Sequence, residues 1–160
     1  TKNKKIIDES LDIMIWAINQ NEKQNLLNNK NELKLISNND FDFKNWLDKY
    51  KYHVRFPKKT KEFYREKCCQ FLDDYEKVLG IDNYLLGDSM TISDIAIFPF
   101  VRQFAFSDIE WFNSQYNHLS NWLNRFISSN LFISVMHKFE VWDNNKKPFL
   151  INFNNYKVNL

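Results

Sequence analysis

Glycine and proline are scarce in this sequence, with two glycines and three prolines among 160 residues. Loops that cradle phosphate groups, and the turns of dinucleotide-binding folds, need glycine where the backbone must approach a ligand or adopt a positive φ. With only Gly80 and Gly87, neither motif can be assembled. The same scarcity favours long helices with short connections over a sandwich of many strands.

Cysteine and histidine are also few, and their spacing does not suit a metal ion. Cys68 and Cys69 are adjacent, and a disulfide between neighbours on a helix would be strained, so we expect two reduced thiols in a cytoplasmic protein. The three histidines show no metal-ligand spacing: His53, His118 and His137. No metal centre is expected.

Long apolar runs and a strong net charge are both missing. No run approaches the ~20 residues of a membrane span, and acids interrupt the apolar stretch 6–18, which excludes a signal-peptide core. The formal net charge is +2, too small to attract nucleic acid or an anionic membrane to the chain as a whole. We expect neither partner. Short lysine clusters, expected to be solvated ends of elements, occur at 2–5, 58–61 and 146–147.

Apolar residues are abundant and recur at helical spacing. They make up 44% of the chain, and aromatic residues 17%, which is enough for the core of one domain of this length. A short strand over Lys4–Asp8 is expected to run into the first helix. Amphipathic helices are predicted over 11–19, 26–36, 43–50, 60–79, 91–104, 119–127 and 132–139.

The predicted helix 60–79 carries the most regular apolar stripe. Gly80 follows it as a C-terminal stop. Cys68 falls on the stripe and is expected to be a small core residue rather than a nucleophile. The helix before it is expected to start after the cluster Asn38-Asn39-Asp40, with Asp40 or Asp42 as its cap.

The helix predicted over 91–104 has the strongest local signal. Thr91 as N-cap and Asp94 three positions later form a capping box, with Asp in place of the usual Glu. The helix is apolar nearly all round, so we expect it to be the buried central helix. Pro99 removes one backbone hydrogen bond and predicts a bend near Ile95.

Two sequence motifs stand at the starts of predicted helices. Tyr84-Leu-Leu-Gly-Asp88 precedes Thr91-Ile-Ser-Asp94, and Tyr116-Asn-His-Leu119 precedes Trp122. Together they resemble the C-terminal domain of the glutathione S-transferase family, with Ser93 where the family often has Ala and Asn117 where it usually has Pro. The resemblance extends to about residue 142 and implies an all-α, glutathione transferase C-terminal-like helical bundle.

The same resemblance gives a meaning to Ile7-Asp8-Glu9-Ser10 near the start of the chain. In the family, the last strand of a thioredoxin-like domain runs into a helix through an acidic residue and a Ser, which hold the γ-glutamyl end of glutathione. The resemblance therefore implies that Glu9 and Ser10 bind glutathione as a co-substrate. It also implies a thioredoxin-like strand–helix remnant over 1–20, a helical domain over 21–142 and a tail over 143–160.

The catalytic Tyr, Ser or Cys of the family lies near the start of the thioredoxin-like domain, so no catalytic residue is expected in this chain. We expect the chain to be an inactive fragment whose parent has about 70 more residues in front, by the size of one small domain. The parent is expected to conjugate or reduce small hydrophobic electrophiles with glutathione. The aromatic candidates for an electrophile pocket are Trp46, Tyr50, Tyr52 and Trp111.

The resemblance also implies a homodimer, formed through the first helices of the helical domain, with Trp46, Tyr50 and the helix of Tyr64 as candidates. Two alternatives keep the fold and change the function. One is a glutaredoxin-like thiol-disulfide oxidoreductase with an N-terminal Cys in the domain that precedes the helices. The other is a non-catalytic assembly module, which a fused partner domain or a charged tail would favour.

Overall fold

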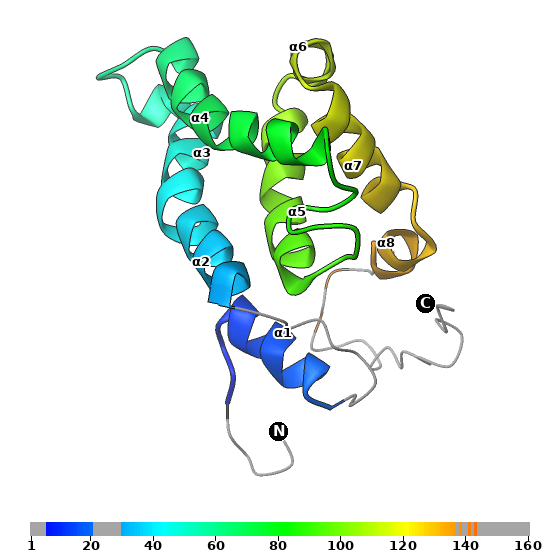
Figure 1. The fold of residues 1–160 in the computed structure, drawn as a ribbon. Helices are drawn as coiled ribbons and strands as arrows, with labels where there is room; N and C mark the ends of the chain where they lie inside the picture. Colours follow the sequence, from blue (N-terminus) through cyan, green and yellow to red (C-terminus); the bar gives the residue numbers. More distant parts are fainter. Residues whose placement is uncertain (1–5, 21–29, 137, 139–140, 142, 144–160) are drawn as a thin grey trace. The chain divides into compact units, whose positions relative to one another are not determined.

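The computed structural model describes residues 6–20, 30–136, 138, 141 and 143 (Figure 1). Within these residues the regular structure is helical and contains no strand, which confirms the all-α prediction. The elements are α1 (Ser10–Ile18), α2 (Lys30–Asn38), the π-helix η1 (Asn39–Phe43), α3 (Lys44–Lys51), the 3-10 helix η2 (His53–Arg55), α4 (Lys61–Leu79), α5 (Ile92–Ala105), α6 (Ile109–Gln115), α7 (Asn117–Ile127) and α8 (Asn130–Val135).

The strand expected before α1 is not seen where the chain is described. Ile6, Ile7 and Asp8 have no regular secondary structure, and Lys4 and Lys5 lie outside the described residues. The chain divides into two compact units, Thr1–Leu123 and Asn124–Leu160. The domain boundaries expected at residues 20 and 142 adjoin undescribed segments and stay predictions.

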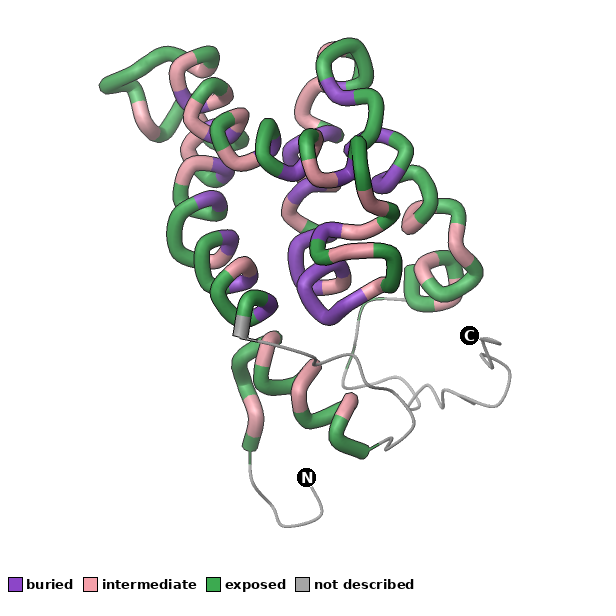
Figure 2. Tube along the Cα trace, viewed as in Figure 1, coloured by how far each residue is buried: buried purple, intermediate pink, exposed green. Residues whose placement is uncertain are grey.

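Helix α5 is the central helix of the first unit, as predicted. Nine of its 14 residues are buried, and Figure 2 shows the buried stretches concentrated on it. Around it, the largest fully buried side chains include Phe43, Tyr50, Phe112 and Trp122. Pro99 lies inside α5, and its side chain is exposed. The bend expected from this proline stays a prediction.

The break predicted between α2 and α3 is absent, which corrects the expectation of a new helix capped by Asp40 or Asp42. The backbone of Asn38 is helical, with φ −60° and ψ −38°, and the chain continues through the π-helix η1 into α3. The buried side continues across this junction: Ile36, Phe43 and Leu47 are each at most 1% exposed. Burial of this apolar side outweighs the weak helix preference of the Asn and Asp residues.

Helix α4 matches its prediction closely. The Thr60 hydroxyl accepts the backbone N–H of Phe63 and begins the helix, while Cys68 is fully buried in the core as expected. The helix ends at Gly80 without a left-handed residue, because Gly80 has φ −75°. Positive φ occurs instead at Gly87, with φ 126°, in the loop before α5.

Candidate functional site

The N-terminus of α1 is the part of the chain to which the sequence assigns glutathione. Glu9 has an extended backbone, with φ −83° and ψ 136°, and its carbonyl accepts the N–H of Ile13 at 3.0 Å. Glu9 and Ser10 are both exposed, and the Glu9 side chain makes no capping hydrogen bond. The N–H groups in the first turn of a helix have no intrahelical acceptor. This end of α1 therefore offers N–H donors to an anion, in a segment that also carries the acidic residues Asp8, Glu9 and Asp12.

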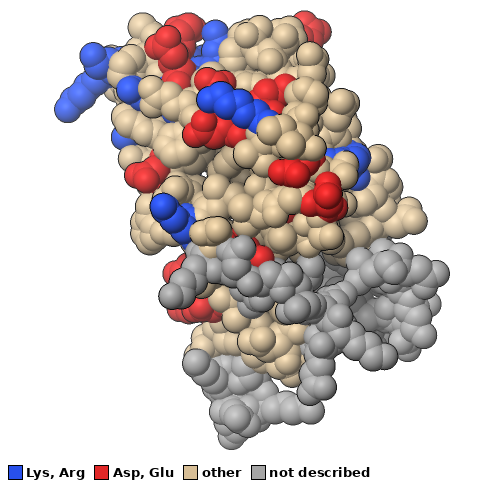
Figure 3. All heavy atoms as spheres, viewed as in Figure 1, with Lys and Arg blue, Asp and Glu red and all other residues tan. Residues whose placement is uncertain are grey.

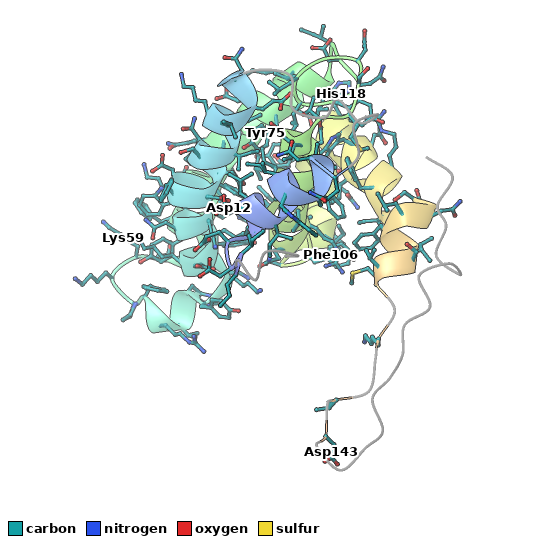
Figure 4. The ribbon with its side chains drawn as sticks, turned by 90° about the horizontal axis from the view of Figure 1, so that it is seen from below. Asp12, Lys59, Tyr75, Phe106, His118 and Asp143 are labelled. Atoms are coloured by element: carbon teal, nitrogen blue, oxygen red, sulfur yellow. The ribbon has the colours of Figure 1, made fainter. Side chains whose placement is uncertain are left out.

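The apolar side of α1 packs against α2 and α5. Its partly buried apolar residues lie against Ile36 of α2 and against Ile92 and Ala96 of α5: Leu11, Met14, Ile15 and Ile18. Figure 4, seen from below, shows α1 lying across the bundle with Asp12 in its first turn. The apolar contacts set the position of Glu9 and Ser10 relative to the start of α5.

The start of α5 is held by Asp94, the acidic residue of the predicted capping box. Its Oδ2 accepts the backbone N–H of Thr91 at 2.9 Å and the Thr91 hydroxyl at 2.9 Å. Its Oδ1 accepts the backbone N–H of Leu85 at 3.0 Å and the indole N–H of Trp122 at 3.1 Å. The prediction of a capping box is confirmed. Leu85 and Trp122 are additional partners that the local spacing did not indicate.

A groove of about 400 Å³ lies beside the N-terminal half of α4. Its lining residues are Thr60, Glu62, Phe63, Arg65, Glu66, Cys69 and Trp111. The Arg65 guanidinium lies 4.2 Å from the centre of the Trp111 ring and pairs with Asp108 at 3.7 Å. The cation thus covers one face of the indole, and Glu62 and Glu66 also line the groove.

The four aromatic residues expected to line an electrophile pocket are not gathered in this groove, because only Trp111 lines it. Tyr50 is 1% exposed and belongs to the core. Trp46 is half-buried, with Lys49 over its ring, and Tyr52 is exposed, with Arg55 over its ring. The electrophile pocket stays a prediction.

The groove and the α1 terminus lie near opposite ends of α5. Trp111 and Tyr50 both contact the ring of Phe104, at centroid distances of 6.2 and 5.1 Å, whereas α1 packs against Ile92 and Ala96. Twelve residues of helix separate Ile92 from Phe104, a rise of about 18 Å. A tripeptide spans at most about 11 Å, and reacting atoms must approach to about 3–3.5 Å. A thiol of glutathione held at α1 by its γ-glutamyl end would therefore fall short of the groove, which counts against the groove as the place where the electrophile meets it.

Glu76 has a structural role that sequence reasoning missed. Its Oε1 accepts the backbone N–H groups of Asn117 and His118 at 3.0 Å each, and its Oε2 accepts that of Leu119 at 2.7 Å. A carboxylate from α4 thus caps the N-terminus of α7. No local signal could reveal it, because the partners lie 41 to 43 residues away.

The two thiols are poorly suited to nucleophilic chemistry. Burial is the main cause that raises the pKa of both Cys68 and Cys69 above that of an ordinary thiol. Cys68 is fully buried and Cys69 is half-buried beside Tyr116, whose hydroxyl donates to Asp73 at 3.0 Å. Thiols of this kind stay protonated at neutral pH, and the thiolate is the reactive form.

The part of the chain that the structure describes holds no group of three or more His, Cys, Asp or Glu arranged to bind a metal ion. In the same residues, no helix combines the length and the apolar character needed to cross a membrane.

Comparison with known proteins identifies the family. A family model described as glutathione S-transferase, C-terminal domain, matches residues 40–130, which is more than half of the 160 residues. A search of curated proteins and a search of solved structures gave no match. The matched range includes the capped helix α5 and Trp122. The chain therefore belongs to the glutathione S-transferase family, of which it carries the C-terminal domain.

Proposed function

We propose that this chain is the helical part of a glutathione-dependent transferase and that the N-terminus of α1 holds the γ-glutamyl end of glutathione. The observation that carries the proposal is the exposed pair Glu9 and Ser10 at a helix N-terminus where the Glu9 side chain makes no capping hydrogen bond. Family membership supports glutathione as the co-substrate. The apolar contacts of α1 with α2 and α5 give this terminus a defined position.

The charged groups at the γ-glutamyl end of glutathione are complementary to Glu9, Ser10 and the first-turn N–H groups of α1. The γ-glutamyl end of glutathione carries one carboxylate and one ammonium group. The carboxylate suits the first-turn N–H groups and the hydroxyl of Ser10, since a helix N-terminus favours negative charge. The ammonium suits the carboxylate of Glu9 in a charge-assisted hydrogen bond.

In the part of the chain that the structure describes, the proposal assigns no such partner to the thiol end of glutathione. Cys68 and Cys69 cannot replace the thiolate, because their own pKa values are raised by burial. In this proposal, the residue that activates glutathione belongs to a thioredoxin-like domain of the parent, which conjugates or reduces small hydrophobic electrophiles in the cytoplasm. The proposal assigns no catalytic residue to the chain and expects no conjugating activity from it alone.

Affinity for glutathione should be weak for the chain alone. Each charge-assisted hydrogen bond contributes ~1.5–3 kcal/mol at best. Association and ordering cost at least ~4 kcal/mol. A dissociation constant in the millimolar range or above follows.

A homodimer remains part of the proposal, but its expected aromatic contacts need revision. Tyr50 and Tyr64 are 1% and 4% exposed, so both side chains are already covered within one chain. Trp46 keeps part of its surface, with Lys49 over the ring. An interface on this side would have to use other residues.

The test is an NMR titration of the amide groups, which detects weak and local binding. Glutathione and S-methylglutathione should shift the amides of Ser10, Leu11 and Asp12 equally, because the proposed contacts do not include the thiol. Cysteinylglycine, which lacks the γ-glutamyl group, should shift none of them. Ser10→Ala should weaken the response several-fold. Ser37→Ala, an exposed serine on α2, is the matched control and should leave it unchanged.

Two outcomes would contradict the proposal. One is an equal response to cysteinylglycine, which would show that the γ-glutamyl group is not recognised. The other is tight binding or thiol conjugation by the chain alone, which would show that the active site lies elsewhere in this sequence. Disulfide reduction without conjugation by the parent would favour the glutaredoxin-like alternative.

A further inference from the structure

Positive charge is concentrated between α3 and the middle of α4. Residues 44–67 contain nine Lys or Arg and three acidic residues, a formal charge of +6. Because the whole chain carries +2, all other residues together carry −4. Within this range, residues 51–59 contain four cations and no acid, and we call them the basic turn. The small net charge of the chain therefore conceals a strongly basic surface.

Most cations of this region make no ion pair with a carboxylate that the structure describes. Arg65 pairs with Asp108 at 3.7 Å. The other eight have no ion pair with any residue that the structure describes. Several lie over aromatic rings instead: Arg55 lies 4.8 Å from the centre of Tyr52, and Lys59 lies 5.1 Å from that of Phe63. These contacts leave the positive charge available to an anionic partner.

The basic turn also presents apolar surface at a fixed position. Val54 is 78% exposed and Tyr52 is 38% exposed. The 3-10 helix η2 carries Val54, and the hydroxyl of Tyr64 donates to the carbonyl of Phe56 at 2.9 Å. The exposed valine is thus held on an ordered turn that is anchored to α4.

The basic turn projects from the bundle. Figure 1 shows the α3–α4 connection extending at the upper left, and Figure 3 shows Lys and Arg side chains at the same place. Lys59, labelled in Figure 4, lies at the edge of the bundle. A flat, negatively charged surface could therefore reach Val54 and the surrounding cations together.

We propose that the basic turn is a docking surface for an anionic lipid bilayer. Its cations and Tyr52, over which Lys51 and Arg55 lie, would be at the headgroup level, and Val54 would enter the boundary between headgroups and acyl chains. Peripheral binding of this kind combines apolar burial with attraction to anionic lipids. The inference is independent of the proposed glutathione site, because it uses no residue of α1.

Two other occupants fit the surface less well. Single-stranded nucleic acid binds by stacking bases on aromatic faces, and here Lys51 and Arg55 lie over Tyr52 while Lys59 and Lys67 lie over Phe63. A second copy of the chain, paired about a two-fold axis, would bring the same cations against each other.

The test is co-sedimentation of the 160-residue chain with phosphatidylcholine vesicles, prepared with and without phosphatidylserine. The chain should bind only the vesicles that contain phosphatidylserine. Lys58→Gln with Lys59→Gln should lower the partition coefficient about 25-fold, at about fivefold for each charge. Val54→Ser should lower it roughly fivefold through lost apolar burial. The matched control pair, Lys34→Gln with Lys138→Gln, removes two exposed lysines outside the region and should change it less than about twofold.

Each alternative outcome overturns the proposal. The first is an absence of binding to vesicles that contain phosphatidylserine, and the second is an equal loss in the control pair. A third is binding to a single-stranded oligonucleotide that is tighter than binding to these vesicles and is unchanged by Val54→Ser. This outcome would assign the surface to nucleic acid. Circular dichroism of every variant separates these outcomes from unfolding.

Discussion

Trp122 donates its indole N–H to Oδ1 of Asp94 at 3.1 Å, across 28 positions of the sequence. Both residues are fully buried. The carboxylate accepts three further hydrogen bonds, from the backbone of Leu85 and from the backbone and hydroxyl of Thr91. One side chain therefore joins the start of α5 to the loop before it and to α7. All of its donors belong to buried residues.

Asp94→Ala should lower the free energy of unfolding by about 3–5 kcal/mol, because several buried donors lose a charged acceptor together. Urea denaturation followed by tryptophan fluorescence measures this change. Asp88→Ala is the control, since Asp88 is exposed and accepts one long bond from Asn83 at 3.4 Å. The control should cost less than about 0.5 kcal/mol. Equal costs for the two variants would mean that the buried network contributes little.

Glu76→Ala should lower the free energy of unfolding by about 2–3 kcal/mol, because three N–H groups at the start of α7 lose their shared carboxylate. The control is Glu66→Ala, an exposed residue of the same helix. Denaturation curves of the two variants should differ in midpoint and share the same slope. A Glu66→Ala variant as unstable as Glu76→Ala would contradict this role.

Asn117→Pro tests why this chain departs from the usual proline of the family. Proline removes the N–H that donates to Glu76 at 3.0 Å, but its fixed φ suits the first position of a helix. The two effects oppose each other, so the free energy of unfolding should change by less than about 1 kcal/mol. In the Glu76→Ala background no bond remains to be lost, so the same substitution should stabilise the chain. Destabilisation in both backgrounds would show that proline does not fit here.

Local sequence patterns were sufficient to predict features that depend on residues close together in the sequence. The spacing of Thr91 and Asp94 predicted the capped start of α5, and the stripe through Cys68 predicted the buried face of α4. Partners brought together by tertiary packing had no such signal. The bonds from Trp122 to Asp94 and from Leu119 to Glu76 cross 28 and 43 residues, and only the fold decides that they form.

The predicted break between α2 and α3 was wrong because burial overruled the local preference of the residues. Asn38-Asn39-Asp40 predicted a helix break, yet Asn39 is fully buried inside a continuous helical segment. Burial also bears on the predicted electrophile pocket, which stays a prediction. The aromatic residues chosen for a ligand pocket included Tyr50, which is buried in the core, because composition cannot separate a core ring from a pocket ring.

Gly87→Ala should be far more costly than Gly80→Ala, although both glycines flank loops. Gly87 has φ 126°, a conformation that a Cβ strains, so alanine should cost about 1–3 kcal/mol even though no atom lies within 4 Å of the new methyl group. Gly80 has an ordinary helical φ of −75°, and its Cβ would lie 3.3 Å from the carbonyl oxygen of Lys77. Its substitution should be nearly neutral, because the tight contact offsets the entropy lost from the unfolded chain. Thermal or urea denaturation of the pair decides between φ strain and space as the cause.

The buried thiol of Cys68 should make the stability of the chain fall at alkaline pH. Burial raises the pKa of this thiol in the folded state, while the unfolded chain has the ordinary value of about 8.5. The stabilisation is therefore complete below about pH 8.5 and is lost as the pH rises toward the folded pKa, because only the unfolded state then releases the proton. Between about pH 7.5 and pH 9.5 the loss from this group is about 1.4 kcal/mol.

Urea denaturation at several pH values in this range measures the effect, and Cys68→Ala isolates it. The variant should be less stable than the unmodified 160-residue chain at neutral pH, because it loses buried volume. Its stability should nevertheless fall less steeply with pH. Tyr75, whose pKa burial also raises, titrates above this range in the unfolded chain and does not confuse the comparison. In parallel, iodoacetamide should label Cys68 slowly in the folded chain and quickly in urea. Identical pH slopes for the two proteins would show that this thiol ionises as readily in the folded state as in the unfolded one.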